Sequence, residues 1–333
     1  MSSPDSGAGI TKAILLVGGK GTRLQPLTNS TPKPMLRIAG RPVTEHQITK
    51  ARAAGVREIV LATSYMAEVF EPYFGDGSRF GIKLHYAIEK EPLGTGGAIA
   101  NAAVALGLDA DESIFIFNGD VLSGHDLLLQ QQFHFSRGAD VTLHLTKVAD
   151  ARAYGCVPID DKGRVSEFLE KMDNPKANTI NAGCYIFSAQ AIGQIPHQTV
   201  VSVERETFPN LLNQGKNLYG YEDSRYWIDM GTPQAMIQAS RDLIMTPSIS
   251  QATPTIVGGA VIELGAVVDS SSIVAEGSFL AAGTRIGANC EISGSIIAEN
   301  SIIEDDAVVR NSYVAPGSRV KSGSRIEDQV FGF

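Results

Sequence analysis

The sequence predicts an α/β domain with a largely parallel sheet, followed by a parallel β-helix, and two observations lead to this order. From Lys12 to about Met245, short apolar runs alternate with segments of helical periodicity, as strands and helices do in an α/β sheet. After Met245 aliphatic residues recur every six positions, which fits neither a helix nor an open sheet. We therefore expect two domains, residues 1–245 and residues 246–333.

Individual elements of the first domain can be placed from local signals. Residues 13–17, 58–63 and 113–118 have the apolar composition of strands, whereas residues 44–54 have a helix start at Thr44 and a stop at Gly55. Strands come closer together between residues 140 and 221, where 161–163 form a candidate hairpin turn, so we expect an antiparallel insertion there. Parallel sheets bind ligands at the carboxyl ends of their strands.

The six-residue period of the second domain extends to the end of the sequence with two slips of one residue. A period of six suits a parallel β-helix in which each face of a coil places one aliphatic side chain inside. We expect this solenoid to stabilise the protein and to support a homo-oligomer. The expected inward residues are Ile256, Ile262, Val268, Val274, Leu280, Ile286, Ile292, Ile297, Ile303, Val309, Val314, Val320 and Ile326.

Composition excludes several classes of protein. Among 333 residues, 43% are hydrophobic and 19% are charged, which disfavours disorder, and the net charge of -8 disfavours nucleic-acid binding. The sequence shows neither a signal peptide nor an apolar run long enough to span a membrane. We therefore expect no membrane partner. Because Cys156, Cys184 and Cys290 are widely spaced and lack paired ligand spacing, we expect reduced thiols and a cytoplasmic location.

A glycine-rich loop follows the first predicted strand. Gly18, Gly19 and Gly21 would let backbone N–H groups approach a polyphosphate closely, and Arg23 and Lys33 would neutralise its charge. The loop differs from the dinucleotide fingerprint, whose last glycine is replaced by a leucine, and it lacks the Gly-Lys-Ser/Thr ending of a P-loop.

The run from residue 18 to residue 34 resembles the signature of the sugar-1-phosphate nucleotidyltransferases, also called nucleotide-sugar pyrophosphorylases. Further matches follow in order, and together they resemble most closely the branch of that family that acts on mannose 1-phosphate. They are EPLGTGG at 91–97, NGDV at 118–121, YG at 154–155, FLEK at 168–171, INAG at 180–183 and WIDMG at 227–231.

This resemblance implies a Rossmann-like catalytic domain, a C-terminal left-handed β-helix of hexapeptide repeats, and Mg²⁺-dependent transfer of a guanylyl group from GTP to α-D-mannose 1-phosphate. The products would be GDP-mannose and pyrophosphate. It implies catalytic roles for Arg23, Lys33, Asp120, Lys171 and Asp229. The implied nucleotide-binding residues are Gly18, Gly19, Gly21, Thr22, Arg23, Gly94 and Thr95, and the implied sugar-phosphate residues are Gly155, Glu170, Lys171, Asn181 and Gly183.

The chemistry of this reaction fits these residue types. Two anions must be brought together, so catalysis is mainly positioning and charge neutralisation, and the sugar phosphate is already ionised without a general base. Asp120, at the end of a strand, and Asp229, in a second strand-like run, supply the oxygen ligands that Mg²⁺ prefers. The six histidines fall outside these motifs, so we assign them no catalytic role.

Three alternatives remain at this point. The same reaction could use heptose 1-phosphate with GTP, or glucose 1-phosphate with UTP or dTTP. An acyltransferase built on the hexapeptide helix would typically need a histidine base there, yet no histidine follows His197. A catalytically silent sensor should have lost a metal carboxylate or the loop arginine, whereas Asp120, Asp229 and Arg23 are all present.

Overall fold

The computed structural model describes residues 9–152, 154–169 and 173–333, and its internal contacts separate two compact units. The first comprises Met1–Gly19 and Lys50–Trp227 and is called the sheet unit; the second comprises Lys20–Thr49 and Ile228–Phe333 and is called the solenoid unit. The segment of residues 20–49, which carries much of the predicted phosphate loop, thus belongs to the same unit as the C-terminal solenoid. The division at residue 245 stays a prediction.

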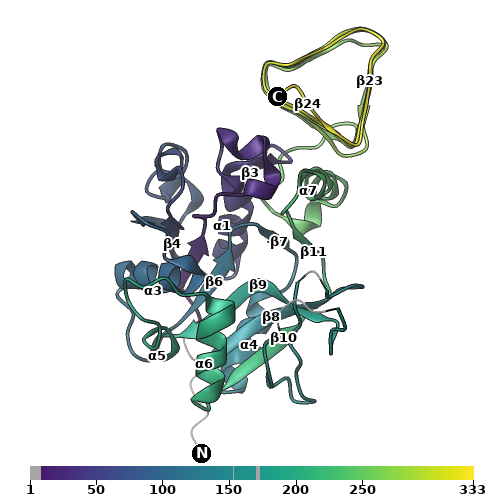
Figure 1. Ribbon diagram of the computed structural model, residues 1–333. Helices are drawn as coiled ribbons and strands as arrows, with labels where there is room; N and C mark the ends of the chain where they lie inside the picture. The colour runs from purple at the N-terminus through teal and green to yellow at the C-terminus, as the bar shows by residue number, and fades with distance from the viewer. Residues whose placement is uncertain (1–8, 153, 170–172) are drawn as a thin grey trace, which may run out of the picture. The chain divides into compact units, whose positions relative to one another are not determined.

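A seven-stranded sheet with the order β10-β8-β9-β6-β1-β4-β5 forms the centre of the sheet unit (Figure 1). Strand β1 is parallel to both β6 and β4, and β4 is parallel to β5, whereas β9 runs antiparallel to β6 and β8. The predicted α/β fold with a mostly parallel sheet is therefore confirmed. The strands are β1 (Lys12–Leu16), β4 (Glu58–Thr63), β5 (Lys83–Ile88), β6 (Ser113–Asn118), β8 (Val141–Lys147), β9 (Thr179–Ser188) and β10 (Leu218–Glu222).

Helices cover both faces of this sheet, because its central strands are buried on both sides. Val141, Leu143 and Leu145 of β8 join one large core cluster, whereas the alternate residues Thr142 and His144 point to the face that α4 covers. The remaining elements are η4 (Ala67–Val69), α2 (Glu71–Phe74), η5 (Ser78–Phe80), α3 (Gly94–Leu106), β7 (Val121–Ser123), α4 (Leu127–Ser136), α5 (Ala189–Ile192), η6 (Val203–Thr207) and α6 (Phe208–Asn213).

The antiparallel part of the chain follows the sequence expectation. An isolated antiparallel bridge joins Ile159 to Val165 around the predicted turn, where Gly163 has a φ of 80°. Most residues other than glycine avoid this φ, so the turn depends on that glycine.

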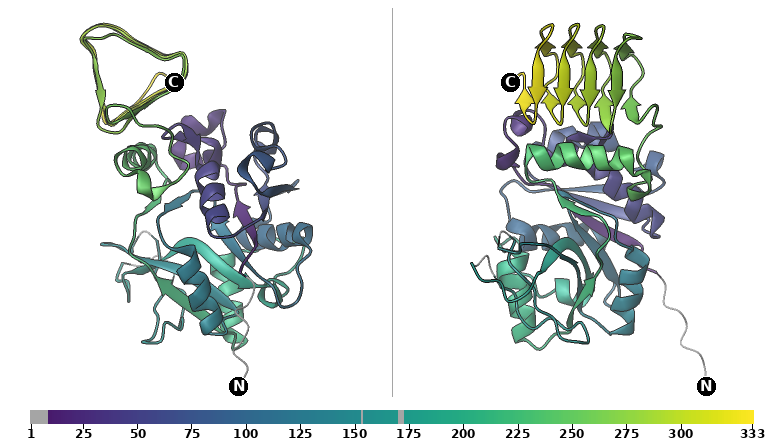
Figure 2. Two further views of the ribbon diagram at one scale, coloured as in Figure 1. Left: turned by 180° about the vertical axis from the view of Figure 1, so that it is seen from behind. Right: turned by 90° about the vertical axis from the view of Figure 1, so that its right-hand side faces the viewer.

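The solenoid unit contains a triangular parallel β-helix, seen along its axis in Figure 1 and with its coils stacked in Figure 2. Its three sheets have the orders β12-β15-β18-β21-β24, β13-β16-β19-β22 and β14-β17-β20-β23, and the described pairs are parallel. The arrangement is that of a left-handed β-helix. Its strands are β12 (Ala260–Ile262), β13 (Val267–Val268), β14 (Ile273–Ala275), β15 (Ser278–Leu280), β16 (Arg285–Ile286), β17 (Glu291–Ser293), β18 (Ile296–Ile297), β19 (Ile302–Ile303), β20 (Val308–Arg310), β21 (Tyr313–Val314), β22 (Arg319–Val320), β23 (Arg325–Glu327) and β24 (Val330–Phe331).

Eleven of the thirteen expected inward aliphatics share the solenoid core. Ile256 precedes the first strand of the solenoid, and Ile262 is 38% exposed in β12, an edge strand of its sheet. The one-residue slips are confirmed too. Three six-residue faces make a coil of eighteen residues, and β12 pairs with β15 at this sequence separation, as in Ala260 with Ser278. The separation between β15 and β18 is only seventeen residues, as in Phe279 with Ile296.

The remaining elements of the solenoid unit precede the β-helix in the chain and include the signature segment. None of the described helices is long and apolar enough to cross a membrane. The elements are η1 (Thr22–Leu24), η2 (Leu27–Asn29), η3 (Lys33–Met35), β2 (Arg37–Ile38), β3 (Arg41–Pro42), α1 (Val43–Ala53), β11 (Trp227–Asp229), α7 (Pro233–Met245) and η7 (Pro247–Ile249), of which α1 and β11 cross a unit boundary.

Candidate active site

The predicted site residues fall into two groups, one in each unit. In the sheet unit, Gly18 and Gly19 follow the carboxyl end of β1. A Cβ on Gly18 would lie 2.6 Å from the Oγ atom of Ser64, which donates a hydrogen bond of 2.7 Å to the Gly18 carbonyl. Gly18 is therefore required by close packing against the end of β4. A Cβ on Gly19 would meet no atom within 4 Å, so this backbone borders open space.

Asp120 lies just beyond β6, the strand that pairs with β1. The N–H group of Gly119 donates to the Leu16 carbonyl at 2.9 Å, and a Cβ on Gly119 would come within 2.5 Å of that oxygen. The chain can turn over the end of β1 only because residue 119 has no side chain. This turn places Asp120 at the carboxyl edge of the parallel strands, as predicted.

Asn181 and Gly183 lie in β9 at an irregularity of its pairing with β8. Gly183 has a φ of 75°, and its N–H group donates to Oδ1 of Asn181 at 3.0 Å. The buried hydroxyl of Tyr185 accepts from Nδ2 of Asn181 at 2.8 Å and from Nδ2 of Asn118 at 3.4 Å. Tyr185 thus connects a predicted sugar-binding asparagine with the asparagine that begins the Asp120 motif.

Gly155 adopts a φ of 79° in the same region. The neighbouring Cys156 packs with Ile180 in a small core cluster that Trp227 also contacts, and the Trp227 indole donates to the Ala182 carbonyl at 3.0 Å. The structure therefore brings Gly155 near the Asn181 segment. Glu170 and Lys171 lie outside the described residues, directly after Leu169, whose backbone pairs with that of Cys156.

Gly94 and Thr95 begin α3 and contact the segment that leads into η6. The Thr95 hydroxyl donates to Oε2 of Glu204 at 3.0 Å and accepts from the Val203 N–H group at 2.8 Å. A Cβ on Gly94, whose φ is 71°, would lie 2.6 Å from the Val201 carbonyl. These contacts fix the start of α3, and its contact with a nucleotide stays a prediction.

In the solenoid unit the structure gathers Gly21, Arg23, Lys33 and Asp229. Lys33 is 8% exposed, and its Nζ atom lies 3.7 Å from Oδ1 of Asp229. Gly21 has a φ of 61°, and a Cβ there would lie 3.0 Å from the Lys33 Cβ. A Cβ on Gly231 would lie 2.9 Å from the Arg23 guanidinium, so that glycine leaves room for the arginine. Thr22 is exposed in η1, beside Arg23.

The carboxylates of the predicted site suit a magnesium ion that is bound partly by substrate oxygens. Mg²⁺ usually binds one or two carboxylates plus phosphate oxygens and water, rather than an all-protein cage. Among the described residues, no group of three or more His, Cys, Asp or Glu side chains could hold a metal by itself. Asp120 in the sheet unit and Asp229 in the solenoid unit are partly buried carboxylates, which is a ligand type that Mg²⁺ prefers.

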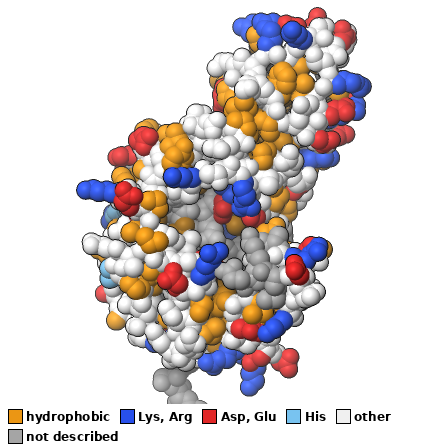
Figure 3. All heavy atoms as spheres, viewed as in Figure 1, with side chains coloured by type: hydrophobic (Ala, Val, Ile, Leu, Met, Phe, Trp, Pro, Cys, Tyr) orange, Lys and Arg blue, Asp and Glu red, His pale blue; other side chains and the backbone are white. Residues whose placement is uncertain are grey.

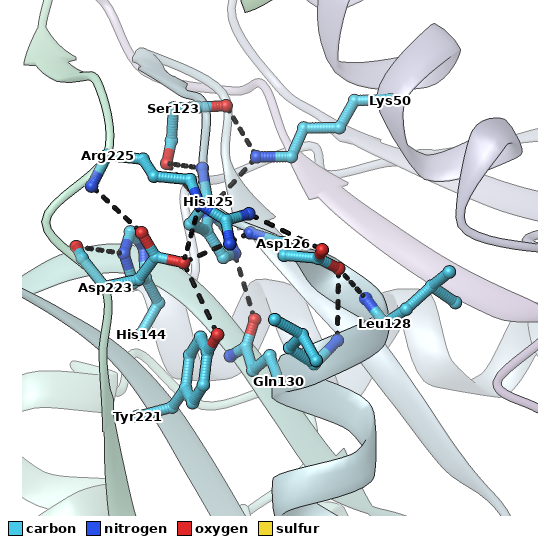
Figure 4. A network of polar contacts seen from close by, with 11 residues as sticks. Lys50, Ser123, His125, Asp126, Leu128, Gln130, His144, Tyr221, Asp223 and Arg225 are labelled. Atoms are coloured by element: carbon cyan, nitrogen blue, oxygen red, sulfur yellow. Dashed lines mark hydrogen bonds and ion pairs between the residues drawn. The ribbon is translucent and has the colours of Figure 1, made fainter.

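The sequence did not predict a buried polar network beside β7, the strand that follows Asp120 (Figure 4). Lys50 donates to the Ser123 carbonyl at 2.5 Å and to Nδ1 of His125 at 3.1 Å. Because Nδ1 accepts, Nε2 of His125 carries the proton and donates to Oε1 of Gln130 at 3.0 Å. The ring of His144 stacks on that of His125 with centroids 3.7 Å apart.

Burial governs the charges of this network. It lowers the pKa of Lys50 to about 8 and that of His144 to about 4, and the ammonium of Lys50 lowers the histidine pKa further. The pKa of His125 is held well below its ordinary value by burial and by the same ammonium. The histidines are therefore neutral structural groups near neutral pH. The sequence could not indicate this network, because its residues come together only when α1, β7, α4 and β8 pack.

Comparison of the sequence with known proteins finds one family along most of the chain. A family model described as nucleotidyl transferase matches residues 12–245. A mannose-1-phosphate guanylyltransferase of Mycobacterium tuberculosis is 52% identical over 233 residues, which are 70% of this chain and 64% of the relative. The catalytic subunit beta of mannose-1-phosphate guanylyltransferase from Danio rerio is 36% identical over 259 residues, covering 76% of this chain and 71% of the relative. The chain thus spans less than two thirds of the length of the first of these relatives.

Solved structures show the same fold. HddC from Yersinia pseudotuberculosis matches with a TM-score of 0.60 at 29% identity, over 70% of this chain and all of that chain. A second structure of HddC, complexed with GMP-PN, matches equally well. A putative glucose-1-phosphate thymidylyltransferase from Bacillus anthracis, at 23% identity and a TM-score of 0.62, shares the fold over 69% of this chain and 94% of that chain.

Proposed function

Because the chain belongs to the nucleotidyl transferase family, we propose that it transfers a guanylyl group from GTP to α-D-mannose 1-phosphate, giving GDP-mannose and pyrophosphate. The observation that carries the proposal is the group of Arg23, Lys33 and Asp229 in the solenoid unit. The two cations lie in the signature loop, Lys33 is 3.7 Å from the Asp229 carboxylate, and Arg23 lies against Gly231. The names of the relatives from Mycobacterium tuberculosis and Danio rerio support the choice of substrates.

Each group has a role that its chemistry supports. Arg23 and Lys33 bind the triphosphate and neutralise the charge that moves to the leaving pyrophosphate. The backbone of Gly18 and Gly19 lets the phosphates approach the end of β1, since no side chain intervenes. In the sheet unit, Asn181, Gly183 and the Glu170 carboxylate orient the sugar hydroxyls. The Lys171 ammonium binds the sugar phosphate.

Magnesium fits the carboxylates Asp120 and Asp229, which would hold it together with phosphate oxygens. When bound, it makes the α-phosphorus more electrophilic and neutralises the phosphates. The protein itself supplies no general base in this proposal, because the attacking sugar phosphate is already an anion at neutral pH. Its residues bind the two anionic substrates, orient them and bring them together.

A pyrophosphate-release assay over a matrix of nucleoside triphosphates and sugar 1-phosphates tests the proposal. We expect the highest kcat/KM for GTP with mannose 1-phosphate, and loss of activity when a chelator removes Mg²⁺. Preference for UTP or dTTP with glucose 1-phosphate, or for GTP with a heptose 1-phosphate, would change the substrates but keep the reaction. No pyrophosphate release with any pair would refute the proposed reaction.

Location and assembly belong to the same proposal. The three cysteines are free and buried, and burial raises the pKa of Cys184 to about 12, so these thiols suit a reducing cytoplasm.

We further propose a homo-oligomer, because β12 is an edge strand of its sheet and the neighbouring Leu264 is 98% exposed. Sedimentation of the purified protein measures this directly, and a monomer at micromolar concentration would contradict it.

A further inference from the structure

Arg37 connects the signature segment to the β-helix within the solenoid unit. Its guanidinium donates to Glu263 through Nη2 and to Oε1 of Glu299 through Nη1 at 2.6 Å. The same Nη2 donates to the Gly40 carbonyl at 2.8 Å. The two glutamates are 226 and 262 residues away along the chain, so this contact is purely tertiary.

These partners belong to three neighbouring coils of one face of the β-helix. Glu263 follows β12, Glu299 follows β18, and β15 lies between these strands in the sheet. From β15, the ring of Phe279 lies under the guanidinium, with its centroid 5.1 Å from Cζ. Glu263 is itself fixed, because its Oε2 accepts from the Ala282 N–H group at 3.0 Å. Arg37 therefore binds a preformed surface of the solenoid.

The β2–β3 turn has the shape that this contact requires. Gly40 has a φ of 82°, and a Cβ there would lie 3.3 Å from the Phe279 ring. The Ala39 N–H group donates to Oγ of Ser240 in α7 at 2.9 Å. Burial opposes the charge of Arg37, but hydrogen bonds to Glu263 and Glu299 raise its pKa above the ordinary value. The guanidinium thus stays charged and doubly paired.

A short chain of hydrogen bonds connects this contact to the phosphate loop. The Leu36 N–H group donates to the Lys33 carbonyl at 3.1 Å, and the Val43 N–H group donates to the Leu36 carbonyl at 3.2 Å. The Thr44 hydroxyl donates to the Pro34 carbonyl at 3.0 Å. Only three residues separate Lys33 from Arg37, so a displacement of β2 moves the Lys33 backbone as well.

We propose that Arg37, paired with Glu263 and Glu299, is a positioning residue through which the β-helix holds Lys33 and the signature loop in the geometry that binds the triphosphate. The proposal rests on the proposed function and adds a role for the solenoid in the reaction. In this role Arg37 acts through Lys33 and the signature loop, and it is assigned no contact with the substrate. The positioning depends on the charge of Arg37 and on its ion pairs with Glu263 and Glu299.

Kinetics of Arg37→Met in the full chain test this role. Methionine keeps an apolar stem against Phe279 but loses both ion pairs, so we expect kcat/KM for GTP to fall about ten- to a hundredfold. The KM for mannose 1-phosphate should change less than twofold. Arg37→Lys keeps the charge but lacks the fork of N–H donors that reaches both carboxylates and the Gly40 carbonyl, so it should give an intermediate loss. The double variant Arg37→Met with Glu299→Gln should lose no more than Arg37→Met alone.

Arg310→Met is the matched control. Arg310 pairs with Glu291 at 2.8 Å on the β-helix, so its removal also deletes a solenoid ion pair but leaves the signature segment untouched. Acidic and basic side chains lie next to one another at the end of the β-helix seen in Figure 3. We expect Arg310→Met to keep kcat/KM for GTP within twofold of the parent. Equal losses in both variants, or no loss in Arg37→Met, would overturn the proposal.

Hydrogen exchange gives a readout that does not depend on activity. In Arg37→Met the amides of Leu24, Met35 and Leu36, whose partners all lie in the signature loop, should exchange about tenfold faster than in the parent and in Arg310→Met. If the parent enzyme released no pyrophosphate with any substrate pair, the proposed function would be refuted. The hydrogen-exchange comparison would still test whether Arg37 holds the signature loop. Unchanged exchange in Arg37→Met would refute the positioning role by itself.

Discussion

Lys33 and Asp229 are two predicted catalytic side chains that the structure brings together within one unit. A charged lysine that is only 8% exposed is costly unless a counter-charge lies near, and the Asp229 carboxylate at 3.7 Å is one such charge. The carboxylate therefore has two functions in our proposal, since it also binds magnesium with the phosphates. This coupling makes Asp229 sensitive to substitution in both stability and turnover.

Asp229→Asn and Asp120→Asn should each lower kcat about 10²- to 10³-fold, because each removes a negative ligand of the metal that neutralises the phosphates. Pyrophosphate release at saturating Mg²⁺ measures this, and circular dichroism checks the fold. Asp150→Asn serves as the control, since Asp150 is an exposed carboxylate paired with Arg152. Near-parental rates in either site variant would remove that residue from the mechanism.

Arg23→Ala and Lys171→Ala should separate the two anion sites. Arg23 lies against Gly231 beside the Lys33–Asp229 pair, so its loss should raise the KM for GTP about tenfold or more. Lys171 is assigned to the sugar phosphate, so Lys171→Ala should instead raise the KM for mannose 1-phosphate. Steady-state kinetics with each substrate varied in turn give both constants. If both variants affect both substrates equally, the assignment is wrong.

Tyr185→Phe should destabilise the protein and weaken sugar binding together. The variant leaves the Nδ2 groups of Asn181 and Asn118 without their hydroxyl acceptor in a buried region, which costs about 1–3 kcal/mol. Urea denaturation and the KM for mannose 1-phosphate measure the two effects. As a control, Tyr86→Phe removes a more exposed hydroxyl, which donates to the Gly75 carbonyl, and should change the free energy of unfolding by less than about 1 kcal/mol. A stability loss with an unchanged KM would restrict Tyr185 to a structural role.

At the scale of elements, buried histidines make the folded state sensitive to acid. Burial lowers the pKa values of His46, His134 and His144 to about 4, whereas in the unfolded chain they return to about 6.5. Between these values the unfolded state binds more protons, so the free energy of unfolding rises with pH in this window and falls on acidification. Each histidine contributes a slope of up to about 1.4 kcal/mol per pH unit.

Urea denaturation at pH 7, 6 and 5 measures this slope. We expect stability to fall progressively below pH 6.5, and His134→Gln to reduce the slope, because one buried imidazole no longer takes up a proton on unfolding. His134 contacts Thr142 and Ser113 through its two ring nitrogens, so the glutamine can keep one hydrogen bond. An identical slope in parent and variant would show that His134 does not titrate on unfolding.

The elements themselves were largely predictable from the sequence, because their signals are local. The strand at residues 58–63 was predicted with its bounds, and the six-residue period even indicated where the coils shorten. The Lys50–His125–His144 network was not predictable, since its members come from α1, the β7–α4 connection and β8 and share no sequence motif. The Arg37 contact escaped prediction for the same reason: its partners lie more than two hundred residues away.

At the scale of the whole molecule, the sequence and the structure divide the chain differently. Hydrophobic periodicity changes at residue 245, which predicts that the catalytic part ends there. The contacts of the structure instead group Lys20–Thr49 with Ile228–Phe333, so Arg23, Lys33 and Asp229 share a unit with the β-helix. Removing residues 246–333 would delete the partners of Arg37 and also Ser250, whose hydroxyl contacts His46 at 2.7 Å. Loss of the solenoid should therefore impair GTP use as well as stability.

Ile292→Ala tests whether the solenoid and the active site lose their structure together. Ile292 is fully buried in β17, so its truncation should cost about 2–5 kcal/mol and lower the temperature at which the coils open. If the signature loop depends on the solenoid, the temperature of half-inactivation must fall by the same amount. Hydrogen exchange of peptides from residues 260–331 and residual pyrophosphate release, measured after the same heating steps, compare the two. Ile273→Ala, at a position of β14 that is 63% exposed, should shift neither. Opening of the coils at a lower temperature with unchanged inactivation would mean that the catalytic machinery is independent of the β-helix, and that a chain ending near residue 245 should stay active.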